Sequence, residues 1–309
     1  MIYTVSLNPA LDKTVQSEGF AVGRQNRVQT VQRDPGGKGI NVSRALAVLG
    51  QKSILLGVLG GETGDFIADR LRGMGFDCDF TDGRTETRTN LKIVDPGTGT
   101  LTELDEPGGP LGEAVLETVH RKLLHEVARG DTVVFSGSLP PEAPPGLYRD
   151  WIADCKKAGA YTVLDTGGEA LALGLEASPD LVKPNRDELQ SLCGRRLQSI
   201  GEAAAAADGL LQKGVRTAVV SLGAEGALLM TRDTTLYGKA PKIEALSTVG
   251  AGDTMVAMLL YARATRLTPA VALQAAIAAG SAKSVRRGTE PPLMPDIQAL
   301  LPRVTVIEL

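Results

Sequence analysis

The residue best placed for chemistry is Asp253, which follows Gly250, Ala251 and Gly252 and precedes a long apolar run. That run, from Thr254 onward, is apolar nearly all round, which predicts a buried helix. Glycines at its start leave backbone N–H groups free to point at a ligand, and the helix dipole adds partial positive charge. The pattern predicts an anion-binding site beside a carboxylate. The alternative is that Asp253 only caps the helix, a common role for Asp.

A second glycine run places Lys38 directly after Gly36 and Gly37. Apolar residues recur at helical spacing after it, so the run opens a helix with Lys38 and Asn41 on an adjoining polar face. These groups offer a cation, an amide and free N–H groups to a phosphorylated or hydroxylated ligand. The alternative is a glycine-rich loop with a lysine in solvent.

A third cluster runs from Ser221 through Gly223 to Gly226. Short apolar segments on both sides make a β-hairpin the simpler interpretation, with a nucleotide contact as the alternative. No glycine cluster leads into the Lys-Ser or Lys-Thr pair of a P-loop, and Val42 stands where a dinucleotide-binding fingerprint has its third small residue. The sequence therefore argues against P-loop NTPases and Rossmann oxidoreductases.

The elements that must position these residues alternate between short β-rich apolar runs and longer helical patterns, as in a parallel sheet covered by helices. We expect strands at 2–7, 53–59, 132–136, 161–165, 180–182 and 217–222. We expect helices at about 38–49, 63–74, 110–128, 146–157, 199–213, 251–265 and 268–286. The prediction is an open α/β fold in a single domain, residues 1–309.

Two stretches interrupt this rhythm, 14–33 and 85–104, where polar and apolar residues alternate as in half-exposed strands. Neither is flanked by a Pro- or Ser-rich linker, and the two lie far apart in the chain. We therefore predict a small discontinuous β-sheet, a lid inserted at about 12–33 and 85–105 of the same domain.

Composition excludes several classes of protein. Hydrophobic residues at 43% and charged residues at 22% are ordinary for soluble globular chains. A net charge of −3 without a basic stripe, and aromatic residues at 4%, argue against nucleic-acid binding. No stretch is apolar and long enough to span a bilayer, and the N-terminus lacks the features of a signal peptide. Three scattered cysteines without a C-x-x-C pair fit a reducing cytoplasm.

Taken together, these segments resemble the PfkB family of carbohydrate kinases, also called the ribokinase family, over essentially the whole chain. The similar segments are 247–254 (STVGAGDT), 35–42 (PGGKGINV), 136–140 (SGSLP) and 181–185 (LVKPN) with Glu188. Four matches in the family's order are more specific than any one glycine loop. The resemblance implies a ribokinase-like fold with a β lid, and ATP and Mg²⁺ as cosubstrate and metal.

Within the family, the segment 8–12 (NPALD) and Lys38 look like the branch that phosphorylates ketohexose phosphates. This resemblance implies conversion of fructose 1-phosphate and ATP to fructose 1,6-bisphosphate and ADP. Tagatose 6-phosphate is the alternative substrate. A sugar-phosphate sensor without catalytic activity on the same fold is the alternative from another class.

The resemblance also implies roles for individual residues. Asp253 would take the proton of the acceptor hydroxyl, and the Gly250, Ala251 and Gly252 backbone would bind the transferred phosphoryl group. The residues implied for the sugar phosphate are Asp12, Arg24, Gly36, Gly37, Lys38, Asn41, Arg88 and Ser138. Those implied for ATP are Lys183, Asn185, Glu188, Ser221, Gly223 and Gly226, with Glu188 reaching Mg²⁺ through water.

A substrate that already carries a phosphate needs cations at its far end, and we assign Lys38 and Arg88 to it, with Arg24 and Lys92 as helpers on the lid strands. Closure of the lid would exclude water from the reaction. The family often dimerises through the exposed face of this lid, so a homodimer is expected. No nucleic acid and no membrane are expected as partners.

Overall fold

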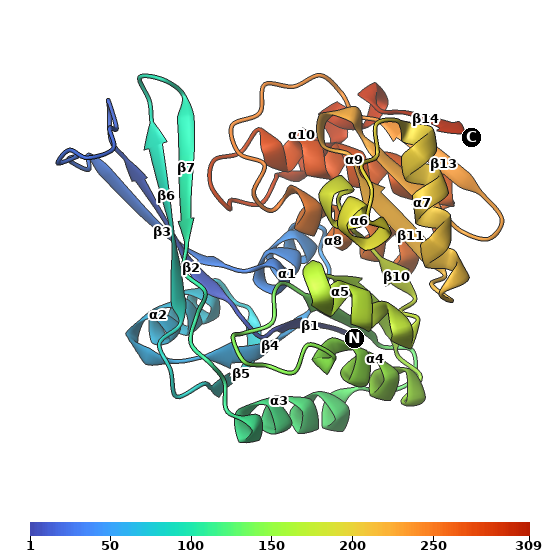
Figure 1. The fold of residues 1–309 in the computed structure, drawn as a ribbon, viewed down its shortest axis with the longest axis horizontal. Coiled ribbons are helices and arrows are strands. Elements are labelled where there is room, and N and C mark those ends of the chain that lie inside the picture. Colours follow the sequence, from blue (N-terminus) through green and yellow to red (C-terminus); the bar gives the residue numbers. More distant parts are fainter.

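The body of the fold is one ten-stranded sheet whose central strands are parallel (Figure 1). The computed structural model describes residues 1–309, with the side chain of Thr30 excepted. In spatial order the parallel strands are β5 (Asp77–Asp82), β4 (Ile54–Leu59), β1 (Ile2–Ser6), β8 (Thr132–Ser136), β9 (Tyr161–Asp165), β10 (Leu181–Val182) and β11 (Thr217–Ser221). Antiparallel strands continue the sheet beyond β11: β12 (Ala227–Met230), β13 (Thr235–Lys239) and β14 (Thr305–Glu308). The predicted open α/β class is confirmed.

Successive residues of a strand point to opposite faces of the sheet, and the buried parallel strands are apolar on both. Helices therefore cover both faces of this sheet. In β8, Val133 and Phe135 join one apolar cluster and Val134 joins another. The Val134 face carries α1 (Lys38–Val48), α2 (Gly61–Gly73), α8 (Ala251–Ala264), α9 (Pro269–Ser284) and α10 (Met294–Leu300). The opposite face carries α3 (Glu113–Glu126), α4 (Leu147–Lys157), α5 (Gly168–Gly174), α6 (Arg186–Cys193) and α7 (Ile200–Gln212). Single 3₁₀ turns lie at Leu175–Ala177, Gly223–Glu225 and Leu301–Arg303.

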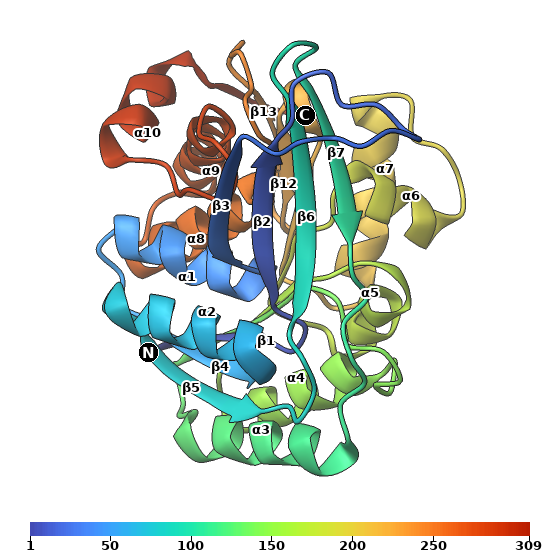
Figure 2. The same ribbon diagram turned by 90° about the vertical axis from the view of Figure 1, so that its left-hand side faces the viewer.

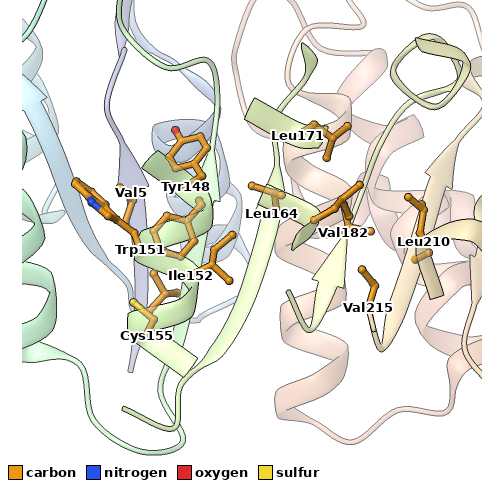
Figure 3. Close-up of a cluster of buried hydrophobic side chains, with 14 of the residues drawn as sticks. Val5, Tyr148, Trp151, Ile152, Cys155, Leu164, Leu171, Val182, Leu210 and Val215 are labelled. Carbon is orange, nitrogen blue, oxygen red and sulfur yellow. The ribbon is translucent and has the colours of Figure 1, made fainter. Parts of the chain in front are cut away.

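The apolar cluster on the Phe135 face extends from Val5 in β1, past α4, to Val215 before β11 (Figure 3). The helix α4 contributes Trp151 and Cys155, four residues apart on its buried side. Burial raises the pKa of the Cys155 thiol to about 12, so this cysteine is a packing residue and not a nucleophile.

The lid is a separate four-stranded sheet that stands beside the main one (Figure 2). Its strands are, in order, β3 (Thr30–Gly36), β2 (Ala10–Gln16), β6 (Arg88–Asp95) and β7 (Thr100–Asp105). The strand β2 pairs antiparallel with β3 and parallel with β6. The two inserts that we expected from alternation thus supply strands of a common sheet, although residues 17–29 between β2 and β3 lie outside any strand.

Several elements escaped the sequence analysis. The strand β5 reads Asp-Cys-Asp-Phe-Thr-Asp, and its charges hide an edge strand that is only half buried. The helices α5, α6 and α10 have seven or eight residues each, too short to show a clear apolar period. Within the described residues, no helix is both long and apolar enough to cross a membrane.

Candidate active site

The carboxyl ends of the parallel strands form one side of an open cleft, and the lid forms the other. Residues that follow β1, β8, β9, β10 and β11 line it, namely Asn8, Ser138, Thr166, Lys183 and Gly223. From β1 the chain continues to β4 and β5 on one side and later returns to β8 on the other side of β1, so the strand order reverses there. Ligands bind open α/β sheets at such a switch point. The cleft encloses about 1440 Å³. Since most small-molecule sites enclose roughly 300–1,000 Å³, it has room for two ligands.

The N-terminus of α8 opens into this cleft. Gly250 precedes the helix with a φ of 79°, in the left-handed region that favours glycine. The N–H of Ala251 donates to the carbonyl of Thr248, whereas the N–H groups of Gly252 and Asp253 have no backbone acceptor within the described chain. Two free amides and the helix dipole make this end a site for an anion. The N–H of Ala251, which we expected to bind the phosphoryl group, is therefore not free.

Asp253 does not cap α8, so the alternative of a purely structural cap was wrong. Its side chain is 5% exposed, and its Oδ2 accepts a hydrogen bond of 2.8 Å from Asn41 Nδ2. Burial, together with the charge of Asp165, raises the pKa of Asp253 to about 6, although Lys38 and Asn41 hold it down. A carboxylate that titrates near neutral pH suits a general base.

Asp165, at the end of β9, joins two lysines beside Asp253. Its buried Oδ1 lies 3.0 Å from Lys38 Nζ and 3.4 Å from Lys183 Nζ. Burial alone would raise the pKa of Asp165, but Lys183 and Lys38 hold it below its usual range. Burial also opposes the charge of Lys38, but Asp165 and Glu188 raise the pKa of this lysine above its ordinary value. Asp165 and Lys38 are therefore ionised together, and the two lysine side chains lie beside the N-terminus of α8.

Asn185 and Glu188 begin the helix α6 with reciprocal hydrogen bonds. The Asn185 side chain accepts from the Glu188 N–H at 2.8 Å, and Glu188 Oε2 accepts from the Asn185 N–H at 2.7 Å. The second oxygen, Glu188 Oε1, faces the cleft 3.7 Å from Lys38 Nζ. Asp165 Oδ2 is buried without a hydrogen-bond partner in the described chain.

These two carboxylate oxygens fit Mg²⁺, which prefers hard oxygen ligands and takes one or two carboxylates together with substrate phosphates and water. Among the described residues, no group of three or more His, Cys, Asp and Glu side chains could hold a metal by itself. A divalent ion would therefore be held here jointly with a phosphorylated ligand.

The cluster from Ser221 to Gly226 forms the predicted hairpin, in which β11 pairs antiparallel with β12 across a 3₁₀ turn. It also lines the cleft through Ser221, Gly223 and Gly226, so the two interpretations are compatible. The position of Gly226 requires glycine, because a Cβ there would lie 1.9 Å from the Gly238 carbonyl oxygen.

The lid end of the cleft is built around Asp12, which is 4% exposed. Its Oδ1 lies 3.1 Å from Lys92 Nζ and accepts from Asn90 Nδ2 at 3.2 Å. A Cβ at Gly36 would lie 2.2 Å from Asp12 Oδ2, so Gly36 makes room for Asp12 and does not itself line the cleft. Gly37 does line it, with a φ of 106°.

Arg88, from the lid strand β6, lies at the same end of the cleft. Its Nε and Nη2 donate to the carbonyl of Asn8, and its Nη1 donates to Asn90 Oδ1 and to the carbonyl of Glu106. Ser138 Oγ accepts from the Asn8 side chain at 3.2 Å. The guanidinium is thus fixed in orientation.

Arg24 is a predicted site residue that the structure does not place in this cleft. It was expected on a lid strand, but it lies in the exposed segment between β2 and β3 and is not among the residues that line the cleft. Alternation of polar and apolar residues fails in this segment, because it carries turn residues such as Gly19 and Gly23 at positive φ.

The sequence analysis missed Asn8, Asn90 and Asp165 as residues of the cleft. Asp165 carried a usable signal, since it ends a predicted parallel strand at the edge where such sheets bind ligands. Asn90 lies in the alternating stretch, opposite Asp12 in the register of β2 and β6. Only the pairing of the two strands reveals that these side chains share a face.

The profile of the pfkB family carbohydrate kinases matches residues 6–297. This chain belongs to that family. Its relatives include 1-phosphofructokinase of Bacillus subtilis strain 168, 36% identical over 311 residues and over the full length of both chains. Another is 1-phosphofructokinase of Xanthomonas campestris pv. campestris, 42% identical over 265 residues, which cover 84% of this chain and 83% of the relative.

Among solved structures, phosphofructokinase-2 of Escherichia coli in complex with substrates and products superposes with a TM-score of 0.93. The identity is 31%, and the match covers 97% of this chain and 98% of that one. The same Escherichia coli protein has also been solved in a tetrameric inhibited form, with a TM-score of 0.91 and 30% identity over the same shares of the chains. The pfkB kinase has therefore the ribokinase-like fold that the sequence predicted.

Proposed function

We propose that this pfkB kinase transfers the γ-phosphoryl group of ATP to fructose 1-phosphate, giving fructose 1,6-bisphosphate and ADP. The observation that carries the proposal is the buried Asp253 at the free N-terminus of α8, with Lys38 and Lys183 joined beside it by Asp165. The choice of fructose 1-phosphate is supported by relatives that are named 1-phosphofructokinase and match along the whole chain.

The reaction asks little covalent chemistry of the protein, because phosphoryl transfer depends mainly on positioning and on neutralising charge. The sugar hydroxyl oxygen forms a bond to the γ-phosphorus as the bond to the ADP oxygen breaks. Asp253 accepts the hydroxyl proton, and Asn41 holds the carboxylate in orientation through its hydrogen bond. The amides of Gly252 and Asp253, with Lys38 and Lys183, stabilise the charge on the transferred group.

Glu188 and Asp165 would hold Mg²⁺, which neutralises charge on the ATP phosphates. Ser221, Gly223 and Gly226 would line the channel for ATP, on the side of the cleft formed by β11. Asp12 and Ser138 would contact sugar hydroxyls at the opposite side. Arg24 would take part only after its segment of the lid moves toward the cleft.

The two cations that we assigned to the existing phosphate now divide between two roles. Lys38 is bound to Asp165 beside Asp253, at the reacting end, whereas Arg88 lies on the lid. We expect Arg88→Met to raise KM for the sugar phosphate by about 10-fold or more with a small change in kcat, because a bound-state contact is lost. We expect Lys38→Met to lower kcat instead. Steady-state kinetics on both variants compare them directly, and an unchanged KM in Arg88→Met would remove Arg88 from the phosphate site.

The substrate assignment is tested by ADP release on a panel of fructose 1-phosphate, fructose 6-phosphate, tagatose 6-phosphate and unphosphorylated hexoses. We expect the highest kcat/KM for fructose 1-phosphate. A preference for tagatose 6-phosphate would select the alternative kinase. Binding of sugar phosphate without release of ADP would identify a sensor, and a preference for an unphosphorylated hexose would contradict the whole assignment.

The lid also supports a homodimer. In the register of the lid strands, Val31 and Leu104 lie on the face turned away from Asp12 and Asn90, and they are 51% and 56% exposed. We expect Leu104→Glu to shift the protein from dimer to monomer, because a charge on an apolar contact surface must be desolvated. Light scattering after size-exclusion chromatography measures the mass. A monomeric parent protein would exclude this interface.

A cytoplasmic location is part of the same proposal. Cys78, Cys155 and Cys193 are all free thiols, which suits a reducing compartment.

A further inference from the structure

Lys283 is a buried cation that does not line the cleft. It lies in the last turn of α9 and is 1% exposed. Its Nζ donates to the carbonyl of Gly288 at 2.8 Å, and no carboxylate lies within ion-pair distance in the described chain. Its Cε is 3.4 Å from the position that a Cβ would take at Gly250. The side chain therefore passes directly behind the residue that opens the anion site of α8.

The same carbonyl is shared with the turn that leads into α8. Ser247 Oγ donates to Gly288 O at 3.2 Å, and the N–H groups of Leu246 and Ser247 donate to the carbonyl of Ser284. Val249 N–H in turn lies 3.4 Å from Ser247 Oγ. Lys283 and Ser247 thus hold one acceptor from two sides, and the conformation of residues 247–250 depends on where that acceptor lies.

Gly288 and the residue after it also lie against the lid. A Cβ at Gly288 would lie 3.9 Å from both Asp34 Oδ2 in β3 and Thr14 Oγ1 in β2. The next residue, Thr289, accepts through its Oγ1 from Arg44 Nη1, which also donates to the carbonyl of Pro35 in β3. Residues 288 and 289 therefore lie between the base of the lid and the anion site.

We propose that Lys283 is a positioning residue, whose ammonium group ties the Gly288 carbonyl to the start of α8 and so couples the position of the lid to the geometry of the Gly252 and Asp253 amides. The inference rests on the proposed role of these amides in phosphoryl transfer. Lys283 itself does not touch substrate.

The groups around Lys283 set its pKa, and therefore the pH range in which its ammonium group is charged and binds the Gly288 carbonyl. Burial, together with the charges of Lys92 in β6 and Arg44 in α1, lowers the pKa of Lys283 to about 8, against the opposing charges of Asp253 in α8 and Glu290 after α9. The ammonium is present at neutral pH and is lost as the pH rises through about 8. The link should weaken over the same interval, since a neutral amine is a weaker donor to a carbonyl.

The test is Lys283→Met, which keeps the length of the side chain and removes the charge. We expect kcat to fall about 10-fold at pH 7, since misplacement of reacting groups by a fraction of an ångström has effects of this order. We expect KM for both substrates to stay within about twofold. The parent enzyme should lose kcat/KM as the pH rises through about 8, and the variant should lack that dependence. Lys157→Met, an exposed lysine of α4, is the matched control.

A lysine that only stabilised the fold would lower the thermal unfolding temperature when it is replaced. Removal of this buried charge should instead leave the thermal unfolding temperature of Lys283→Met unchanged or raised. With that result, the loss of kcat does not come from unfolding. If Lys283→Met does not fold, Ser247→Ala removes the other donor to Gly288 O and should lower kcat in the same direction. Parent-like kcat and pH dependence in the folded variant would overturn the link. If Asp253→Asn is also fully active, the proposed role of Asp253 as the base fails instead.

Discussion

Asp253→Asn is expected to lower kcat by about three orders of magnitude, the range that a general base contributes. The asparagine is isosteric and can still accept a hydrogen bond from Asn41 Nδ2, which lies 2.8 Å from Asp253 Oδ2 in the parent. It cannot take the proton of the sugar hydroxyl. Affinities for ATP and for fructose 1-phosphate, measured by calorimetry, should therefore stay within a few-fold of the parent while turnover, measured by coupled ADP release, collapses.

The same substitution should make the protein more stable, which separates loss of chemistry from loss of fold. Because the folded-state pKa of Asp253 is raised to about 6, its contribution to stability is fully present below the unfolded pKa and is lost as the pH rises through about 6. At pH 7 to 8 the ionised carboxylate is thus a cost. Removing it should increase the free energy of unfolding by about 1–3 kcal/mol in urea titrations. The exposed Asp65→Asn in α2 is the control and should change neither quantity. Near-parental turnover in Asp253→Asn would end its assignment as the base.

Two groups with opposite roles bound the pH range of the enzyme. Asp253 must be ionised to accept a proton, so kcat/KM should rise as the pH increases through about 6. Lys283 must be charged to hold the Gly288 carbonyl, so kcat/KM should fall above about 8. A bell-shaped profile of kcat/KM reports such a pair of pKa values for the free enzyme. The optimum then lies between them, near neutral pH.

The sequence predicted six of the seven parallel strands, all but β5, and the helix of Asp253, because these depend on local patterns. Each strand is a short apolar run, and the apolar run after Thr254 admits only a buried helix. The lid was visible for the same reason, since alternation marks a half-exposed strand. In Asp12 and Asn90, by contrast, proximity arises from the parallel pairing of β2 with β6, segments about 78 residues apart. No local pattern contains that register.

Lys38 is a clearer example of a contact that local sequence patterns do not predict. Its position after two glycines predicted a cation near the start of α1, and the structure has it there. Its partner was a matter of tertiary structure, because Asp165 is 127 residues away and reaches Lys38 only through the order of the strands. A cation assigned from sequence to the far phosphate of the sugar therefore lies in a network with Asp165, Glu188 and Asp253, at the end of the cleft where we propose that the phosphoryl group is transferred.

Asp165→Asn is the second substitution with a large expected effect, because Asp165 acts on three groups at once. Its charge raises the pKa of Asp253, so its removal should move the acidic limb of the kcat/KM profile to lower pH, by roughly one unit. Lys38 and Lys183 lose their shared carboxylate, and an uncompensated buried charge costs about 3 kcal/mol of stability. Because the pKa of Asp165 is depressed in the folded protein, its stabilising effect is present above the unfolded pKa and is lost only in acid.

Asp180→Asn is the matched control for this change. Asp180 is likewise buried, lies 3.2 Å from Arg216 Nε and accepts a hydrogen bond from the Thr162 N–H, but it is outside the cleft. It should lower stability without moving the pH profile, whereas Asp165→Asn should do both. An unshifted acidic limb in a folded Asp165→Asn would show that the charge of Asp165 does not set the pKa of Asp253. Asp253 would then titrate independently of Asp165, and the cleft would contain two separate charged sites: Asp253, and Asp165 with its two lysines.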